Sequence, residues 1–167
     1  MTFEIDISVR QSAVSVNIAE LNRAVEHALR TERVASAVLS ISIVDNDAIH
    51  RINREHLQHD YPTDVISFQL DFSRDDAIAF PDDAACELRA SGAMIEGEVI
   101  ASAEMASEMA TTGQWTAMNE LTLYVIHGLL HICGYDDLTS SEKAIMRSRE
   151  RAILNALSLT PVYPNDE

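Results

Sequence analysis

Cysteine is scarce in this sequence, and so are long apolar runs. Cys86 and Cys133 are the only two cysteines, and their number and placement do not suggest a disulfide framework, so both are expected to be reduced structural thiols. No apolar run reaches the roughly 20 residues needed to span a bilayer. The first residues, MTFEIDISVRQ, lack the basic start and apolar stretch of a secretion signal. The default expectation is therefore a cytoplasmic protein without a membrane partner.

Lysine is almost absent. Lys143 is the single lysine, and the formal net charge is −15 at pH 7. Nonspecific nucleic-acid binding depends on lysine and arginine side chains that neutralise phosphates. The composition therefore argues against a general, high-affinity RNA-coating protein. It does not argue against a protein with a local basic groove, or against one that a protein partner guides to RNA.

Strand and helix patterns alternate along the 167 residues without internal repeats or low-complexity tracts. Strands are predicted at residues 3–9, 37–44, 64–70 and 97–102. Helices are predicted from Asn17 to about Glu32, from Asp45–Asp47 to Leu57, from Ala103 to Thr111, from about Thr116 to Cys133, and from Thr139 through Leu154. The order indicates a single domain over residues 1–160, of the α+β or mixed α/β class, with a helix-covered sheet of about four strands.

Two stretches do not match these patterns. Residues 71–96 contain seven acidic residues against only Arg74 and Arg89, and they are expected to form an acidic, partly mobile connection. Residues 161–167, PVYPNDE, are expected to form a loose C-terminal tail.

The stretch HGLLHICGYDD, residues 127–137, carries the strongest chemical signal. His127 and His131 are four apart, so they lie on one face of a helix and can chelate one borderline metal ion, most often zinc. Gly134 offers the left-handed residue that ends a helix and reverses the chain. That reversal can return Asp136 or Asp137 to the histidines as a third ligand, with the fourth position open.

A simpler interpretation stands beside this one. A single histidine in a core helix is usually just hydrogen-bonded, and histidine pairs at this spacing recur by accident in helical proteins. Cys133 lies two residues past His131 and on a different side of the helix, so it is discounted as a ligand. No general base is evident.

Three blocks of the sequence resemble the YbeY family of endoribonucleases, bacterial rRNA-maturation factors that bind zinc. HGLLHICGYDD resembles the family signature HGxLHLxGYDH, residues 61–68 (YPTDVISF) resemble xPTDVLSF, and residues 97–102 (GEVIAS) resemble GDIxIS. The resemblance implies a zinc-dependent, single-strand-specific endoribonuclease of rRNA maturation and ribosome quality control. It implies one zinc ion per chain, held by His127, His131 and Asp137. The implied partners are single-stranded rRNA or the small ribosomal subunit, with a ribosomal protein or a ribosome-associated GTPase.

Two positions depart from the family pattern. Asp137 stands where the family has its third histidine ligand, and Leu57 stands where the family usually has an arginine thought to serve RNA cleavage. The helical spacing from Ile49 to Leu57 predicts core packing for the leucine. We therefore treat Arg54, His56 and His59 as candidate substitutes for the missing cation. The family match also puts Thr63, Asp64 and Ser67 near the site, although Thr63 and Asp64 also suit a purely structural turn.

Two other functions remain open from the sequence. Metallopeptidases with an HExxH motif carry a glutamate general base directly after the first histidine, and this chain has Gly128 there. A non-catalytic, zinc-stabilised ribosome-assembly factor is the second alternative, favoured by Leu57 and the acidic composition.

Overall fold

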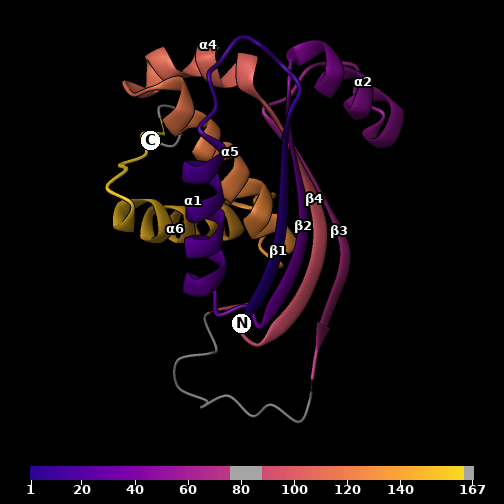
Figure 1. Ribbon diagram of the computed structural model, residues 1–167, viewed down its shortest axis with the longest axis vertical. Helices are drawn as coiled ribbons and strands as arrows, with labels where there is room; N and C mark the ends of the chain where they lie inside the picture. Colours follow the sequence, from indigo (N-terminus) through magenta and orange to yellow (C-terminus); the bar gives the residue numbers. More distant parts are fainter. Residues whose placement is uncertain (76–87, 164–167) are drawn as a thin grey trace.

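The structure is a computed structural model that describes residues 1–75 and 88–163 (Figure 1). The elements in chain order are β1 (Thr2–Val9), α1 (Ile18–Thr31), β2 (Ser36–Val44), α2 (Asn46–Leu57), β3 (Val65–Arg74), β4 (Ala93–Ser102), α4 (Ala103–Gly113), α5 (Ala117–Ile132) and α6 (Ser140–Ala156). The predicted α+β class with a four-stranded sheet in one domain is confirmed. Among the described helices, none is both long and apolar enough to cross a membrane.

Helix starts follow local side-chain chemistry. Asn17 accepts a hydrogen bond from the Glu20 N–H at 3.1 Å, as predicted for the start of α1, and Thr139 accepts one from the Glu142 N–H at 3.2 Å at the start of α6. A side-chain oxygen at this position satisfies a backbone donor that has no partner within the helix. These caps fix where the two helices begin, close to the predicted positions.

The sheet has the strand order β1-β2-β4-β3, in which the first three strands are parallel and β3 is antiparallel to β4. Alternate residues of its strands point to opposite faces. One face, which includes Ile41 and Val99, packs with residues of α1, α5 and α6 into the main core. The other face carries a smaller cluster in which Ile49 of α2 meets Val44, Ile66 and Ile100. Figure 1 shows α1, α5 and α6 on one side of the sheet and α2 apart from them, near one end.

Helix α5 lies unusually close to β3 and β4. A Cβ added to Gly128 would lie 2.9 Å from Val99 Cγ1, and one added to Gly97 would lie 2.6 Å from Ile132 Cδ1 and 2.8 Å from the Phe68 carbonyl oxygen. The two glycines therefore let the helix rest directly on the sheet. This close packing fixes the height of the α5 side chains above β3.

The acidic connection predicted for residues 71–96 is shorter than expected. β3 continues to Arg74 and β4 begins at Ala93, because the two strands pair along their whole length, with a register shift between Gln69 and Asp71. Residues 76–87, which include Cys86, lie outside the described residues.

The loose tail predicted from Pro161 is wrong for its first residues. Pro161 is buried, and Tyr163 donates a 2.6 Å hydrogen bond to Glu150, which ties this part of the chain to α6. Residues 164–167 lie outside the described residues.

The core-packing role predicted for Leu57 is also wrong. Leu57 is 42% exposed, whereas Ile49 on the same helix is fully buried. The apolar cluster under α2 includes Ile49 and Ile52 but not Leu57, because the helix ends there at Gln58 in a left-handed conformation. Helical spacing therefore predicted the buried position of Ile49 but not the exposure of Leu57 at the end of the helix.

Candidate metal centre

His127 and His131 lie one turn apart on α5, a helix whose other residues from Leu121 to Ile132 are all buried. The two side chains are 15% and 28% exposed, and their Nε2 atoms are 3.1 Å apart. The apolar sequence of the helix makes it bury nearly every side, so the histidines mark the place where it reaches solvent. The predicted pair therefore does converge.

The other ring nitrogen of each histidine has a hydrogen-bond acceptor. His127 Nδ1 donates to Glu150 Oε1 at 2.6 Å, and His131 Nδ1 donates to the Tyr135 carbonyl oxygen at 3.1 Å. Since both acceptors require a proton on Nδ1, each Nε2 of the neutral rings presents a lone pair towards the other. Two lone pairs at this separation repel unless a proton or a metal ion lies between them.

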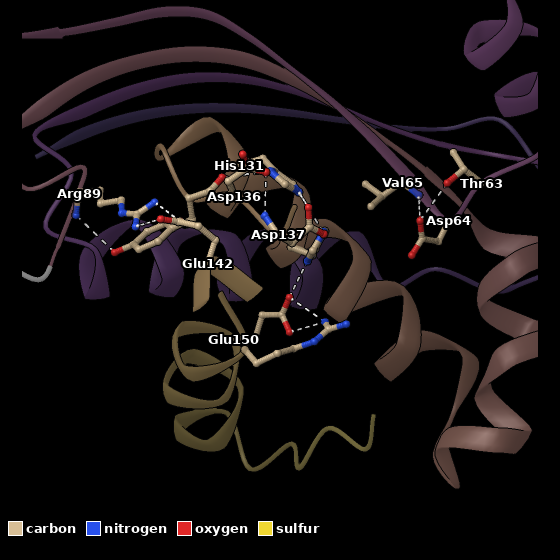
Figure 2. Close-up of polar contacts among 12 residues, drawn as sticks. Thr63, Asp64, Val65, Arg89, His131, Asp136, Asp137, Glu142 and Glu150 are labelled. Carbon is tan, nitrogen blue, oxygen red and sulfur yellow. Dashed lines mark hydrogen bonds and ion pairs between the residues drawn. The ribbon is translucent and has the colours of Figure 1, made fainter. Parts of the chain in front are cut away.

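A carboxylate completes the cluster. Gly134, at φ +97°, reverses the chain after α5. Asp137 thereby returns to a position beside His131 (Figure 2). Its Oδ2 lies 3.4 Å from His127 Nε2, and its Oδ1 lies 3.7 Å from His131 Nε2. Asp136 instead accepts the Asp137 N–H at 2.7 Å. Of the two alternatives, the geometry brings Asp137 to the cluster.

The spacing of these three atoms suits zinc. Bonds of about 2.1 Å in tetrahedral geometry separate neighbouring ligand atoms by about 3.4 Å. The observed separations are 3.1, 3.4 and 3.7 Å, close to this value. Two imidazoles and one carboxylate are also an ordinary donor set for a zinc ion with one open position. His127, His131 and Asp137 therefore fit the metal that the sequence predicted.

The pKa values of the two histidines shift in opposite directions. Burial lowers the pKa of His127, but hydrogen bonds and charge from Asp137 and Glu150 outweigh it and raise the pKa to about 9. Burial and the neighbouring charge of His127 lower the pKa of His131. The hydrogen bond from His127 lowers the pKa of Asp137, with help from the charge of Arg147. In the metal-free protein at neutral pH, His127 therefore carries a second proton, on Nε2, in addition to the one on Nδ1.

Glu150 was not predicted as a site residue. It is fully buried on α6, and besides His127 it accepts hydrogen bonds from Arg147 Nη1 at 2.9 Å and from the Tyr163 hydroxyl at 2.6 Å. The sequence did contain a signal: Glu150 lies on the apolar face that Met146, Ile153 and Leu154 form. An acidic residue on such a face needs partners in the core.

A second buried carboxylate orients the other histidine indirectly. Glu32, fully buried, accepts hydrogen bonds from the Tyr135 hydroxyl at 2.7 Å and from Arg149 Nε at 2.8 Å. The Tyr135 carbonyl is the group that accepts from His131. Glu32, the residue that caps the end of α1, therefore holds the Tyr135 side chain, and Arg149 of α6 pairs with the same carboxylate. This link was also absent from the sequence predictions.

Two hollows flank the cluster and share Thr63, Asp64, His127 and Asp137. The Ser67 hollow, about 480 Å³, is also lined by Leu57, Ser67, Gln69 and His131. The Tyr163 hollow, about 450 Å³, is also lined by Met105, Glu120, Tyr124, Arg147 and Tyr163.

The structure therefore brings three of the predicted substrate residues, Thr63, Asp64 and Ser67, next to the cluster. Asp64 also has a structural role, because its Oδ1 accepts from the Val65 N–H at 2.8 Å and the Thr63 hydroxyl at 3.1 Å (Figure 2).

The three candidate cations lie elsewhere. Arg54, His56 and His59 are exposed and are not among the residues that line either hollow. Arg54 Nη1 lies 3.9 Å from Asp60 Oδ1. The His56 ring packs edge-on against the Phe68 ring. The His59 ring stacks on the Tyr61 ring. The geometry does not bring them to the cluster.

The fold and this cluster define a class: a single α+β domain with a three-ligand candidate metal centre that has room for a substrate on either side. Comparison with known proteins makes the class specific. The profile of the endoribonuclease YbeY family matches residues 6–158, and the chain belongs to this family. The predicted family and its enzyme class, a hydrolase acting on RNA, are thereby confirmed.

Individual relatives agree with this membership. The chain is 36% identical over 166 residues to the endoribonuclease YbeY of Rhodopirellula baltica, covering 98% of this chain and 76% of that protein. It is 33% identical over 161 residues to that of Bacillus subtilis, covering 95% and 98%. The solution structure of TM1509 from Thermotoga maritima matches with a TM-score of 0.54 at 20% identity, over 92% and 91% of the two chains. This last match supports the fold alone.

Proposed function

We propose that this chain is a zinc-dependent, single-strand-specific endoribonuclease that acts in rRNA maturation and ribosome quality control in the cytoplasm. The observation that carries the proposal is the spacing of the His127, His131 and Asp137 ligand atoms, which suits tetrahedral zinc beside two hollows. Family membership supports RNA as the substrate. A bound zinc ion would supply Lewis acidity towards a phosphodiester and activate water.

The residues of the chain prepare the site for that ion. Glu150 and the Tyr135 carbonyl accept from the Nδ1 protons, so both Nε2 atoms would be available to hold a zinc ion. Asp137 adds a negative charge that a third histidine lacks. A zinc ion held by these residues would therefore be a weaker Lewis acid than one in a three-histidine site and would make water less acidic.

The acidic composition supports delivery of the substrate by a larger assembly. With a net charge of −15, the chain gains little from phosphate contacts in general. We propose that it binds free RNA weakly and associates more strongly with the small ribosomal subunit, through a ribosomal protein or a ribosome-associated GTPase. Tight, salt-insensitive binding to naked RNA contradicts this part of the proposal.

One observation favours a non-catalytic assembly factor as the second candidate. Leu57, at the position where the resemblance leads one to expect an arginine, lines the Ser67 hollow. The metallopeptidase alternative loses support, because Gly128, at the position of a general base, faces Val65 and Val99 in the sheet.

A single-turnover cleavage assay separates enzyme from binder. Zinc-loaded protein in excess is mixed with end-labelled single-stranded RNA and with the same sequence as a duplex, and His127→Ala is the matched control. Cleavage of the single strand only, lost in His127→Ala and after chelation, supports the proposal. Intact RNA with fully zinc-loaded protein favours the assembly factor instead.

A further inference from the structure

The surroundings of the candidate metal centre are strongly acidic. Asp64 and Asp137 line both hollows, and Glu120 lines the Tyr163 hollow. Among the described residues that line either hollow, Arg147 supplies the one guanidinium, and no lysine contributes. A phosphodiester that approaches the cluster therefore meets three carboxylates and a single permanent cation besides any metal ion.

Arg147 is held in a fixed position rather than left to rotate in solvent. Its Nη1 donates to both oxygens of the buried Glu150 carboxylate, at 3.2 and 2.9 Å, and its Cζ lies 4.1 Å from the centre of the Tyr163 ring. The aromatic face and the carboxylate together orient the guanidinium plane. A guanidinium has five N–H donors, so one that pairs with a carboxylate can also donate to a phosphate.

The same carboxylate also holds the metal-ligating histidine. Glu150 Oε1 accepts from His127 Nδ1 at 2.6 Å while it accepts from Arg147. One fully buried side chain thus sets the position of both a candidate metal ligand and the neighbouring cation. This link places the guanidinium at a constant position relative to the metal centre.

We propose that Arg147 binds a phosphate of the RNA strand in the Tyr163 hollow, next to the metal centre, and that Glu150 positions it for that contact. A planar guanidinium suits bidentate recognition of phosphate oxygens. The inference rests on the proposed function, because it names the substrate contact of that same site.

Arg151 provides a matched control. It lies one turn further along α6, and its Cζ lies 4.9 Å from the same Tyr163 ring, yet it is exposed and lines neither hollow. Arg147→Gln and Arg151→Gln therefore remove the same charge from the same helix and ring. They differ in whether the lost group faces the hollow.

The test measures binding of a fluorescein-labelled single-stranded RNA by anisotropy at several salt concentrations, with a chelator present so that no cleavage occurs. We expect Arg147→Gln to weaken binding about 10-fold and to reduce the slope of log K against log salt by about 0.7, the loss of one phosphate contact. Arg151→Gln should keep the wild-type slope. Equal slopes and affinities for the two variants overturn the proposal.

A second pair of variants guards against a folding defect. If circular dichroism shows that Arg147→Gln is unfolded, Arg147→Lys is compared with Arg151→Lys, because lysine keeps the charge but loses the bidentate fork. A several-fold loss of affinity at position 147 alone supports the contact, and equal affinities overturn it. Failure of the wild type to cleave RNA refutes the proposed function, whereas the binding comparison still decides the role of Arg147.

Discussion

His127 and Glu150, 23 residues apart and on different helices, are joined by a 2.6 Å hydrogen bond from Nδ1 to Oε1. The bond fixes the histidine tautomer and turns Nε2 towards His131 and Asp137. A carboxylate behind a metal-ligating histidine raises the basicity of the ring and limits its rotation. The contact makes α6 part of the metal centre, although the three candidate ligands lie on α5 and the loop that follows it.

Glu150→Gln tests this relationship. The amide cannot accept all the hydrogen bonds that the carboxylate accepts from His127, Arg147 and Tyr163, so the imidazole loses basicity and orientation. We expect zinc affinity to fall about 10- to 100-fold, measured by competition with a chromophoric chelator. Glu142→Gln is the control. It removes a carboxylate from the same helix, α6, but that carboxylate pairs with Arg89 and not with His127. Equal zinc affinity in Glu150→Gln and the wild type contradicts a positioning role.

Zinc affinity should depend on pH through His127. Its pKa is raised to about 9 in the metal-free protein, so at neutral pH the ion must displace one proton. The lowered pKa values of His131 and Asp137 leave both ready to bind. We expect apparent affinity to rise about 10-fold per pH unit from pH 6 to 8 and to level off above pH 9.

Calorimetry in two buffers of different ionisation enthalpy tests that expectation directly. Release of close to one proton per zinc ion at pH 7, and little release at pH 10, is the predicted result. An affinity that stays constant between pH 6 and 8 shows that His127 is already unprotonated in the metal-free protein.

Gly97→Ala should weaken the packing of α5 on the sheet. The new methyl group would meet the Phe68 carbonyl oxygen at 2.8 Å, and backbone in a paired strand cannot easily move away. We expect a loss of about 2 kcal/mol in the free energy of unfolding, or about 5 °C in Tm. Ser107→Ala on the exposed side of α4 should change Tm by less than about 1 °C.

Gly128→Ala offers a graded comparison. Its methyl group meets the side chains of Val99 and Val65, at 2.9 and 3.0 Å, rather than backbone, and alanine also favours the helix. We therefore expect a smaller loss of stability than for Gly97→Ala. The reverse order in thermal melting contradicts the packing argument.

The parts of the fold that the sequence predicted are those that local chemistry decides. The caps at Asn17 and Thr139 mark helix starts because a side chain bonds to a backbone N–H three residues on. β3 and β4 were predicted too short because their outer residues, such as Asp71 and Arg74, are held by pairing between strands. That pairing depends on a partner strand far along the chain and leaves little trace in the local pattern.

In the candidate site, too, local sequence predicted some residues and contacts between distant segments decided the others. The helical repeat alone put His127 and His131 on one face. It left Asp136 and Asp137 open as the third ligand; the family resemblance chose Asp137, and the path of the chain after Gly134 brings that residue to the histidines. Glu150 and Arg147 reach the cluster from another helix, so no spacing within the motif could reveal them. Contacts between helices carry the information that was missing.

The third ligand itself is open to test by substitution. Both oxygens of Asp137 face the histidines, at 3.4 Å from His127 Nε2 and 3.7 Å from His131 Nε2, whereas Asp136 bonds to the Asp137 backbone. Asp137→Ala removes one of three ligands, so we expect zinc to be lost on gel filtration. Asp137→His restores a nitrogen donor on the same backbone path and should keep the ion.

Asp136→Ala is the matched control, since it deletes the adjacent carboxylate and leaves the cluster intact. It should bind close to one zinc ion per chain, apart from a small loss of loop stability through the missing 2.7 Å hydrogen bond. Metal content of the three purified variants, measured by mass spectrometry, decides between the two residues. Full occupancy in Asp137→Ala together with loss in Asp136→Ala would move the third ligand to Asp136. That result would also require the loop after Gly134 to rearrange around the ion, because Asp136 now accepts from the backbone N–H of its neighbour.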